Sequence, residues 1–88
     1  MAQWYFYDPD RDLSIYGFSS EKGAVVGAMG YVRKFPSKTV FIYKVATYTG
    51  ILIGKVHMGI QNGHELLKYR TDEGEYLLRP DGRKIKKG

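Results

Sequence analysis

Turn-forming residues recur at short intervals along this chain of 88 residues, and they restrict its fold more than any other feature. Pro, Asp, Asn and Gly gather at residues 8–12, 49–50, 61–63, 72–74 and 80–82. Gly and Asn allow positive φ angles and Pro fixes φ, so each cluster favours a tight turn. The intervals suit single strands, apart from one longer segment that can hold a helix. The pattern predicts an antiparallel sheet with one helix.

The residue types indicate where the first two strands and the helix lie. Residues 4–7 are aromatic, and residues 13–18 alternate in polarity, which predicts an N-terminal β-hairpin around the Asp-rich turn. Ser19 or Ser20 suits a helix N-cap, because a serine hydroxyl accepts from an amide two or three residues further on. Pro36 forbids continuation of the helix. One central helix is therefore expected over about residues 20–35.

Three glycines lie within the expected helix. Gly23, Gly27 and Gly30 each cost roughly 1 kcal/mol relative to Ala, so contacts with the rest of the fold must offset a weak helix propensity. They could line a groove for a ligand, or they could let another part of the chain pack closely. The small and apolar residues at three- and four-residue spacing favour close packing on a sheet.

Residues 39–47 and 51–58 predict a second hairpin, whose register the sequence leaves open. A two-residue loop would place Lys44 opposite Lys55, on one face with His57, and this group would form a candidate anion-binding patch. Phe41, Tyr43, Val45, Leu52, Val56 and Met58 would then share the face that covers the helix. A three-residue loop would instead place Lys55 across from Tyr43 and dissolve the patch. In either register the lysines could simply be solvated on an open face.

The remaining residues predict short strands over 65–70, 75–79 and 83–87, with Leu67, Tyr69, Tyr76 and Leu78 facing inward. The expected fold is α+β: a hairpin, a helix and an antiparallel meander, with the helix on one sheet face and the other face open. Residues 1–88 are expected to form one small domain, in which residues 79–88 are a basic edge strand or a frayed tail.

The net charge of +5 is concentrated at one end of the chain. Residues 79–88 contain five basic residues and one acidic residue, whereas residues 1–78 contain nine basic and eight acidic residues. A basic protein attracts nucleic acids and anionic membranes through its overall field. Here that argument depends on residues 79–88, because residues 1–78, the body of the protein, are nearly neutral.

Several kinds of chemistry find no support in the sequence. The chain has no cysteine, and neither histidine has a carboxylate at metal-ligand spacing, so no metal site is expected. No glycine-rich phosphate loop is present, and no cofactor is expected. The apolar runs are far shorter than a membrane span, and no signal peptide begins the chain. We expect a cytoplasmic protein that is not an enzyme.

Gly17-Phe18-Ser19-Ser20, the helix and the strand at residues 39–43 resemble one element of three unrelated groups. These groups are the peptidoglycan-binding sporulation-related repeat, the arm-type DNA-binding domain of phage integrases, and the toxin-type ADP-ribosyltransferases. Glu73-Gly74-Glu75 also resembles the Glu-x-Glu strand of the transferases, which implies a catalytic role for Glu75. Phe6 stands where that family has an arginine for its nicotinamide cofactor. A resemblance to three groups at once indicates a generic element.

The leading hypothesis is a small binding module, of the kind found among phage or prophage accessory proteins, that binds a protein or itself. Its contact surface would be the open sheet face or an edge strand. The alternative is a nucleic-acid-binding domain, since tyrosines on a sheet can stack on bases while cations contact phosphates. A degenerate ADP-ribosyltransferase-like fragment is the remote alternative. The candidate binding residues are Tyr16, Lys44, Tyr48, Lys55, His57, Tyr69, Arg83, Lys84, Lys86 and Lys87.

Overall fold

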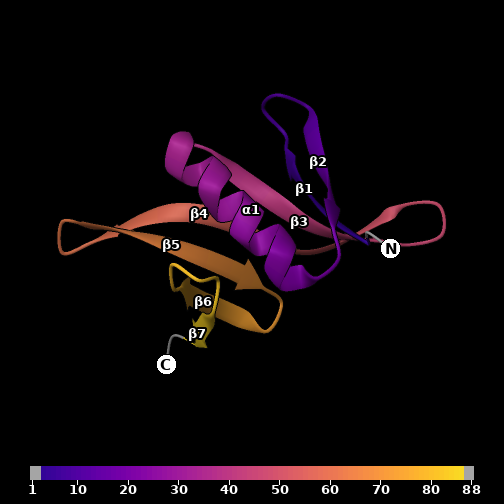
Figure 1. Ribbon diagram of the computed structural model, residues 1–88. Coiled ribbons are helices and arrows are strands. Elements are labelled where there is room, and N and C mark those ends of the chain that lie inside the picture. The colour runs from indigo at the N-terminus through magenta and orange to yellow at the C-terminus, as the bar shows by residue number, and fades with distance from the viewer. Residues whose placement is uncertain (1–2, 87–88) are drawn as a thin grey trace.

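The computed structural model describes residues 3–86, which contain one helix and seven strands (Figure 1). In chain order these are β1 (Trp4–Asp8), β2 (Leu13–Phe18), α1 (Glu21–Lys34), β3 (Thr39–Val45), β4 (Gly50–Gln61), β5 (His64–Thr71), β6 (Gly74–Leu78) and β7 (Lys84–Lys86). The strands form one sheet in the order β2-β1-β3-β4-β5-β6-β7, and every neighbouring pair is antiparallel. The predicted α+β fold is confirmed.

The helix begins and ends where the sequence predicts. Ser20 is the N-cap, and its Oγ accepts a hydrogen bond from the Gly23 amide at 3.0 Å. Glu21 stands in the first turn and Arg33 and Lys34 in the last, which suits the helix dipole at both ends. The helix therefore has favourable termini despite its glycines.

The core lies between one face of the helix and one face of the sheet. The helix packs mainly on β1, β3 and β4, and Figure 1 shows it lying across one side of the sheet only. The buried core residues are Phe6, Ala24, Val25, Ala28, Met29, Val32, Val40, Ile42, Val56, Leu67 and Tyr69. The opposite face of the sheet, which we call the open face, has no helix over it.

Gly27 allows β2 to pack closely against the helix. A Cβ atom built on Gly27 would lie 2.7 Å from Cζ of Phe18 and 3.3 Å from Cε2 of Phe6. A real Cβ atom would clash with the Phe18 ring at that distance. This contact supports the packing interpretation for Gly27, whereas a Cβ atom on Gly30 would meet no atom within 4 Å.

A buried carboxylate connects β1 to the helix. Asp8 is 1% exposed, and its two oxygens accept hydrogen bonds from the Tyr31 hydroxyl at 2.5 Å and the Asp10 amide at 3.0 Å. Burial alone would raise the pKa of Asp8, but these hydrogen bonds and nearby Lys38 outweigh it and lower the pKa. The charged form is therefore the stable form in the folded protein.

Both predicted registers of the second hairpin are wrong. Val45 pairs with Gly50 and Lys44 with Ile51, so residues 46–49 form a longer loop, in which the Ala46 amide donates to the Thr49 carbonyl at 2.7 Å. A β-bulge at Ile53 then shifts the pairing by one residue. Lys55 consequently lies across from Phe41, and it does not face Lys44.

The predicted division between the two faces is partly reversed, and on β4 the bulge places Leu52 on the open face. Val40 and Ile42 are buried under the helix, whereas Phe41 and Tyr43 lie on the open face, opposite to the prediction. Val56 faces the helix as predicted. A period-2 pattern cannot locate a bulge, because the extra residue changes the alternation on one strand alone.

Gly54, directly after the bulge, is predicted to tolerate no side chain. A Cβ atom there would lie 2.6 Å from both the carbonyl oxygen of Arg70 and Cε1 of buried Tyr69. We expect Gly54→Ala to lower the free energy of unfolding by about 1–3 kcal/mol, measured by urea denaturation. Gly30→Ala is the matched control, because a Cβ atom there meets open space. In the helix this substitution should raise stability by about 1 kcal/mol. Equal stability of the two variants would contradict the prediction.

Candidate binding surface on the open sheet face

The antiparallel register arranges the middle of the open face in rows that run across the strands, and three of these rows matter here. The first row contains Tyr16, Tyr5, Tyr43 and Leu52; the second contains Ser14, Tyr7, Phe41, Lys55, Arg70 and Glu75; the third contains Thr39, His57, Lys68, Leu77 and Ile85. Aromatic side chains occupy β2, β1 and β3, and basic side chains occupy β4 and β5. The open face thus has an aromatic half beside a basic half.

The aromatic half is built on a stack of tyrosine rings. The Tyr5 and Tyr43 rings are stacked, with centroids 5.1 Å apart and 7° between their planes, and the Tyr16 ring lies 4.6 Å from Tyr5. Tyr16 is 65% exposed, so this end of the stack is open to solvent. Burial, together with neighbouring Tyr16 and Tyr43, raises the pKa of Tyr5, which keeps its hydroxyl protonated.

The basic half combines side chains from two neighbouring strands. Lys55 is paired with Arg70, and His57 with Lys68, in the register of β4 and β5. Lys68 forms an ion pair with Glu75 on β6 at 3.7 Å. Lys55 and Arg70 form no ion pair with any residue in the range 3–86. Their charges are therefore available to a bound anion.

His57 is a neutral member of this basic half. Its Nδ1 atom is shielded from solvent and has no hydrogen-bond partner among the described residues. Burial lowers the pKa of His57 below its ordinary value of 6.5; Glu75 acts in the opposite direction, and Lys55, Lys68 and Arg70 lower the pKa further. The imidazole is consequently uncharged at neutral pH.

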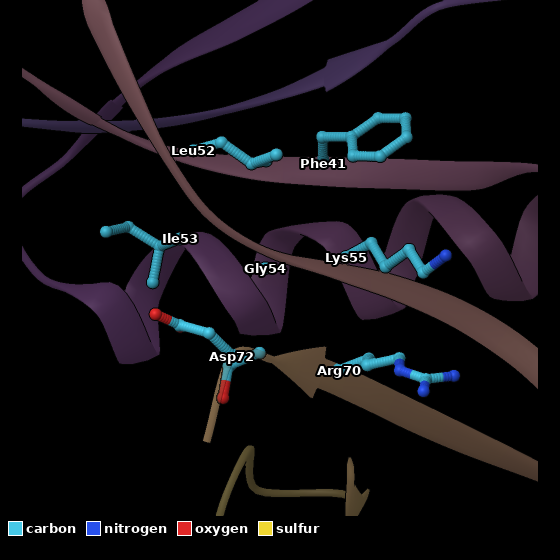
Figure 2. A pocket seen from close by; sticks show the side chains of 8 residues that line it. Phe41, Leu52, Ile53, Gly54, Lys55, Arg70 and Asp72 are labelled. Atoms are coloured by element: carbon cyan, nitrogen blue, oxygen red, sulfur yellow. The ribbon is translucent and has the colours of Figure 1, made fainter. Parts of the chain in front are cut away.

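A groove of about 440 Å³ lies on the open face where the two halves meet. Its lining consists of Phe41, Leu52, Ile53, Gly54, Lys55, Arg70, Thr71 and Asp72. Figure 2 shows Lys55 and Arg70 extending toward the same end, whereas Asp72 lies at the other end beside Ile53. The helix is visible behind the strands in this view, which places the groove on the face opposite the helix.

The predicted binding residues divide between the two faces. Tyr16, Lys55 and His57 lie on the open face. Lys44 lies on the helix side, with its Nζ 5.9 Å from the centre of the Trp4 ring. Tyr48 is 98% exposed in the loop between β3 and β4. The predicted patch of Lys44 with Lys55 and His57 therefore does not form.

Tyr69 cannot stack on a base, and its assignment as a stacking residue is wrong. Its side chain is fully buried beneath the helix, and its hydroxyl donates to Glu21 Oε2 at 2.9 Å. Burial and this hydrogen bond raise the pKa of Tyr69 far above its ordinary value. Tyr69 instead attaches β5 to the first turn of the helix, in agreement with its predicted inward position.

The described cations near the C-terminus each have a partner within the protein, which for Lys84 and Lys86 lies in residues 1–78. Arg83 forms an ion pair with Asp81 at 2.9 Å and Lys84 with Glu21 at 3.3 Å, and Lys86 donates to the Glu73 carbonyl. The Nζ atoms of Lys84 and Lys86 also lie 5.1 Å and 4.9 Å from the centre of the Tyr76 ring. These contacts place Lys84 and Lys86 away from the open face. Lys87 lies outside the described residues.

The sequence-based prediction missed Lys68, Arg70 and Phe41. A signal was available for the first two: Leu67 and Tyr69 were expected to face inward, so their neighbours on the same strand must face outward. Phe41 was missed because residues 40–43 are all apolar or aromatic, so their pattern does not show which of them face the helix. Glu75 lies at the margin of the open face and pairs with Lys68, as described above.

Neither a metal-binding cluster nor a membrane-spanning helix is present among residues 3–86. Within residues 3–86, no group of three or more His, Cys, Asp or Glu side chains is arranged to hold a metal ion. The one helix of the described chain is neither long nor apolar enough to cross a membrane.

Comparisons of the chain with protein-family models, with curated proteins and with solved structures each gave no match. No residue role can therefore be carried over from a relative.

His57 is predicted to make the folded protein less stable in weak acid. Its folded-state pKa is lowered, so the unfolded chain takes up a proton as the pH falls below about 6.5 while the folded protein resists protonation. The free energy of unfolding should consequently decrease below that pH. In His57→Gln this decrease should be smaller, as measured by urea denaturation over a pH series.

His64→Gln is the control for this prediction, because His64 is exposed beside the turn between β4 and β5. If both variants alter the pH dependence equally, the burial of His57 is not the cause.

Proposed function

We propose that this protein is a non-enzymatic, cytoplasmic binding module whose open sheet face binds single-stranded nucleic acid. The observation that supports the proposal most directly is the contact between the aromatic and basic halves, where Phe41 lies across from Lys55 and Lys55 lies beside Arg70. Exposed bases of a single strand can stack on aromatic rings while lysine and arginine contact the phosphates.

The distribution of charge supports this ligand more strongly than the total charge does. The body of the protein is nearly neutral, but three basic residues, Lys55, Lys68 and Arg70, share the open face with two acidic ones. Glu75 lies in the rows described above, and Asp72 lies at one end of the groove. Asp8, Asp10 and Asp12 lie in or beside the turn between β1 and β2, at the far end of the chain's first hairpin. A local excess of positive charge attracts a polyanion even where the whole molecule has little net charge.

The size of the basic half sets the expected strength of binding. Three cations can contact about three phosphates, and each phosphate contact on a single strand contributes about −0.7 to the slope of log K against log salt concentration. The expected slope is therefore about −2. Such a protein would bind weakly through charge alone, so the aromatic half must supply the remaining affinity through stacking.

Replacement of Lys55 and Arg70 tests the proposal. We expect the double variant Lys55→Gln, Arg70→Gln to bind a single-stranded oligonucleotide about ten-fold more weakly, with a salt slope reduced by about 1.4, because two phosphate contacts are lost. Fluorescence anisotropy over a salt series measures both quantities.

The matched control is Lys22→Gln, Lys34→Gln, which removes the same charge from the helix. If the control weakens binding as much as the open-face variant, the field of the whole molecule is responsible and the open face is not the binding surface. Absence of binding by the unmodified protein would contradict the proposal itself.

A second candidate function, self-association, is favoured by the hairpin of β3 and β4. Residues 45–54 include no charged side chain, and Val45, Tyr48, Ile51 and Leu52 are exposed there. Exposed apolar residues gathered in this way mark surfaces that bind other proteins. A second copy of the chain is the partner that fits, because two such hairpins can meet without repulsion between like charges.

Sedimentation equilibrium over a range of protein concentrations tests this candidate. The average mass of the unmodified protein should rise with concentration, and Tyr48→Lys, Leu52→Lys should abolish the rise, because lysines would then face lysines. Ile60→Lys is the control, since Ile60 is exposed near the other end of β4. A constant monomer mass for the unmodified protein would exclude self-association through this hairpin.

A further inference from the structure

The groove on the open face has opposite charges at its two ends. Lys55 and Arg70 stand at one end and Asp72 at the other, with the apolar side chains of Phe41, Leu52 and Ile53 lining the groove as well (Figure 2). An extended polyanion needs only cations, whereas this groove also presents the carboxylate of Asp72, a residue of the turn between β5 and β6. Its position indicates a ligand that carries a hydrogen-bond donor at one end and a negative charge at the other.

Asp72 is exposed and is held at its place in the turn between β5 and β6. The Glu73 amide donates to Thr71 Oγ1 at 3.1 Å, which fixes the backbone on both sides of Asp72. The Asp72 carboxylate forms no ion pair and no hydrogen bond with any residue from 3 to 86. Its two oxygens are therefore available to accept hydrogen bonds from a bound molecule.

A single nucleotide matches this arrangement. Its phosphate carries the negative charge that Lys55 and Arg70 can bind, and its base is a flat ring that can pack on Phe41 and Leu52. A groove of about 440 Å³ is within the size range of sites for small molecules. The polar edge of the base would then lie toward Asp72.

The bases differ in what they offer to a carboxylate. Guanine presents two adjacent donors on its Watson–Crick edge, the N1 hydrogen and the N2 amino group, which match the two oxygens of a carboxylate. The amino groups of adenine and cytosine each lie beside a ring nitrogen that is an acceptor and repels the carboxylate. Thymine and uracil place their single ring donor between two carbonyl oxygens. Only guanine can form the bidentate pair.

We infer that this groove binds one nucleotide of a single strand and that Asp72 selects guanine. The inference rests on the proposed function, because it assigns a base preference to the same open face. Lys55 and Arg70 position the phosphate, Phe41 and Leu52 contact the base, and Asp72 accepts from N1 and N2.

Titration of the protein with the 5′-monophosphates of guanosine, inosine, adenosine, cytidine and uridine, followed by amide chemical shifts, tests the inference. Guanosine monophosphate should bind about ten-fold more tightly than the others. Inosine lacks only the N2 amino group of guanosine, so the difference in affinity between the two nucleotides measures the contact of that group with Asp72. The shifts should centre on the residues that line the groove.

Asp72→Asn should remove the preference for guanine. It should also improve binding of xanthosine monophosphate, whose base has a carbonyl oxygen in place of the N2 amino group and can pair with an amide. Glu73→Gln is the matched control, because it removes the same charge from the same turn without altering the groove lining. It should keep the guanine preference.

The outcomes separate the inference from the proposed function. Oligonucleotide binding with equal affinity for all five nucleotides would overturn the selection by Asp72 and leave the open face as a nucleic-acid surface. A guanine preference that persists in Asp72→Asn would overturn the role of Asp72. Shifts centred on residues 45–50 would place the ligand outside the groove. Failure to bind any oligonucleotide would overturn both.

Discussion

The bulge at Ile53 is the constraint on which the two faces of this sheet depend. β4 lies at the centre of the sheet and pairs with β3 and β5 along its length. The extra residue lets Gly54 lie against Tyr69 on the helix side, while Leu52 remains on the open face across from Tyr43. In a strand without the bulge, Leu52 would share a face with Gly54 and Val56, because alternate residues point to the same side. The bulge thus lets β4 contribute Val56 to the core and Leu52 to the groove.

The second constraint is the separation of charge between the faces. Lys55, Lys68 and Arg70 point away from the helix, whereas Lys84 is bound to Glu21 on the helix side. The sum of charges along the chain contains no information about this separation. A nearly neutral body can therefore have a basic face, because alternate residues on a strand point to opposite sides.

Local signals in the sequence predicted most of the fold. Ser20, Glu21 and Pro36 define the ends of the helix through capping, the helix dipole and the missing amide of proline, all of which act over a few residues. The turn residues, which also act over a few residues, predicted where the strands lie. These features depend on the nearest neighbours in the chain, so the sequence expresses them directly.

The candidate site was less predictable, because it depends on register. Whether Lys55 faces Lys44, Tyr43 or Phe41 is decided by the length of the loop at residues 46–49 and by the bulge. Neither has an unambiguous signature in the sequence. The outward positions of Lys68 and Arg70 could have been derived from the predicted inward position of Tyr69. That inward position also excludes Tyr69 as a stacking residue.

The last two strands of the sheet, β6 and β7, lie at one edge of it. The helix packs mainly on β1, β3 and β4, and Figure 1 shows β6 and β7 beyond its edge. The turn before β7 touches the helix where Gly82 packs against Val26, and Lys84 reaches Glu21. Elements with few buried apolar contacts separate at the lowest free energy. We therefore expect β7, whose three residues are exposed and pair with β6 at the sheet edge, to detach and reattach while the helix and the central strands remain folded.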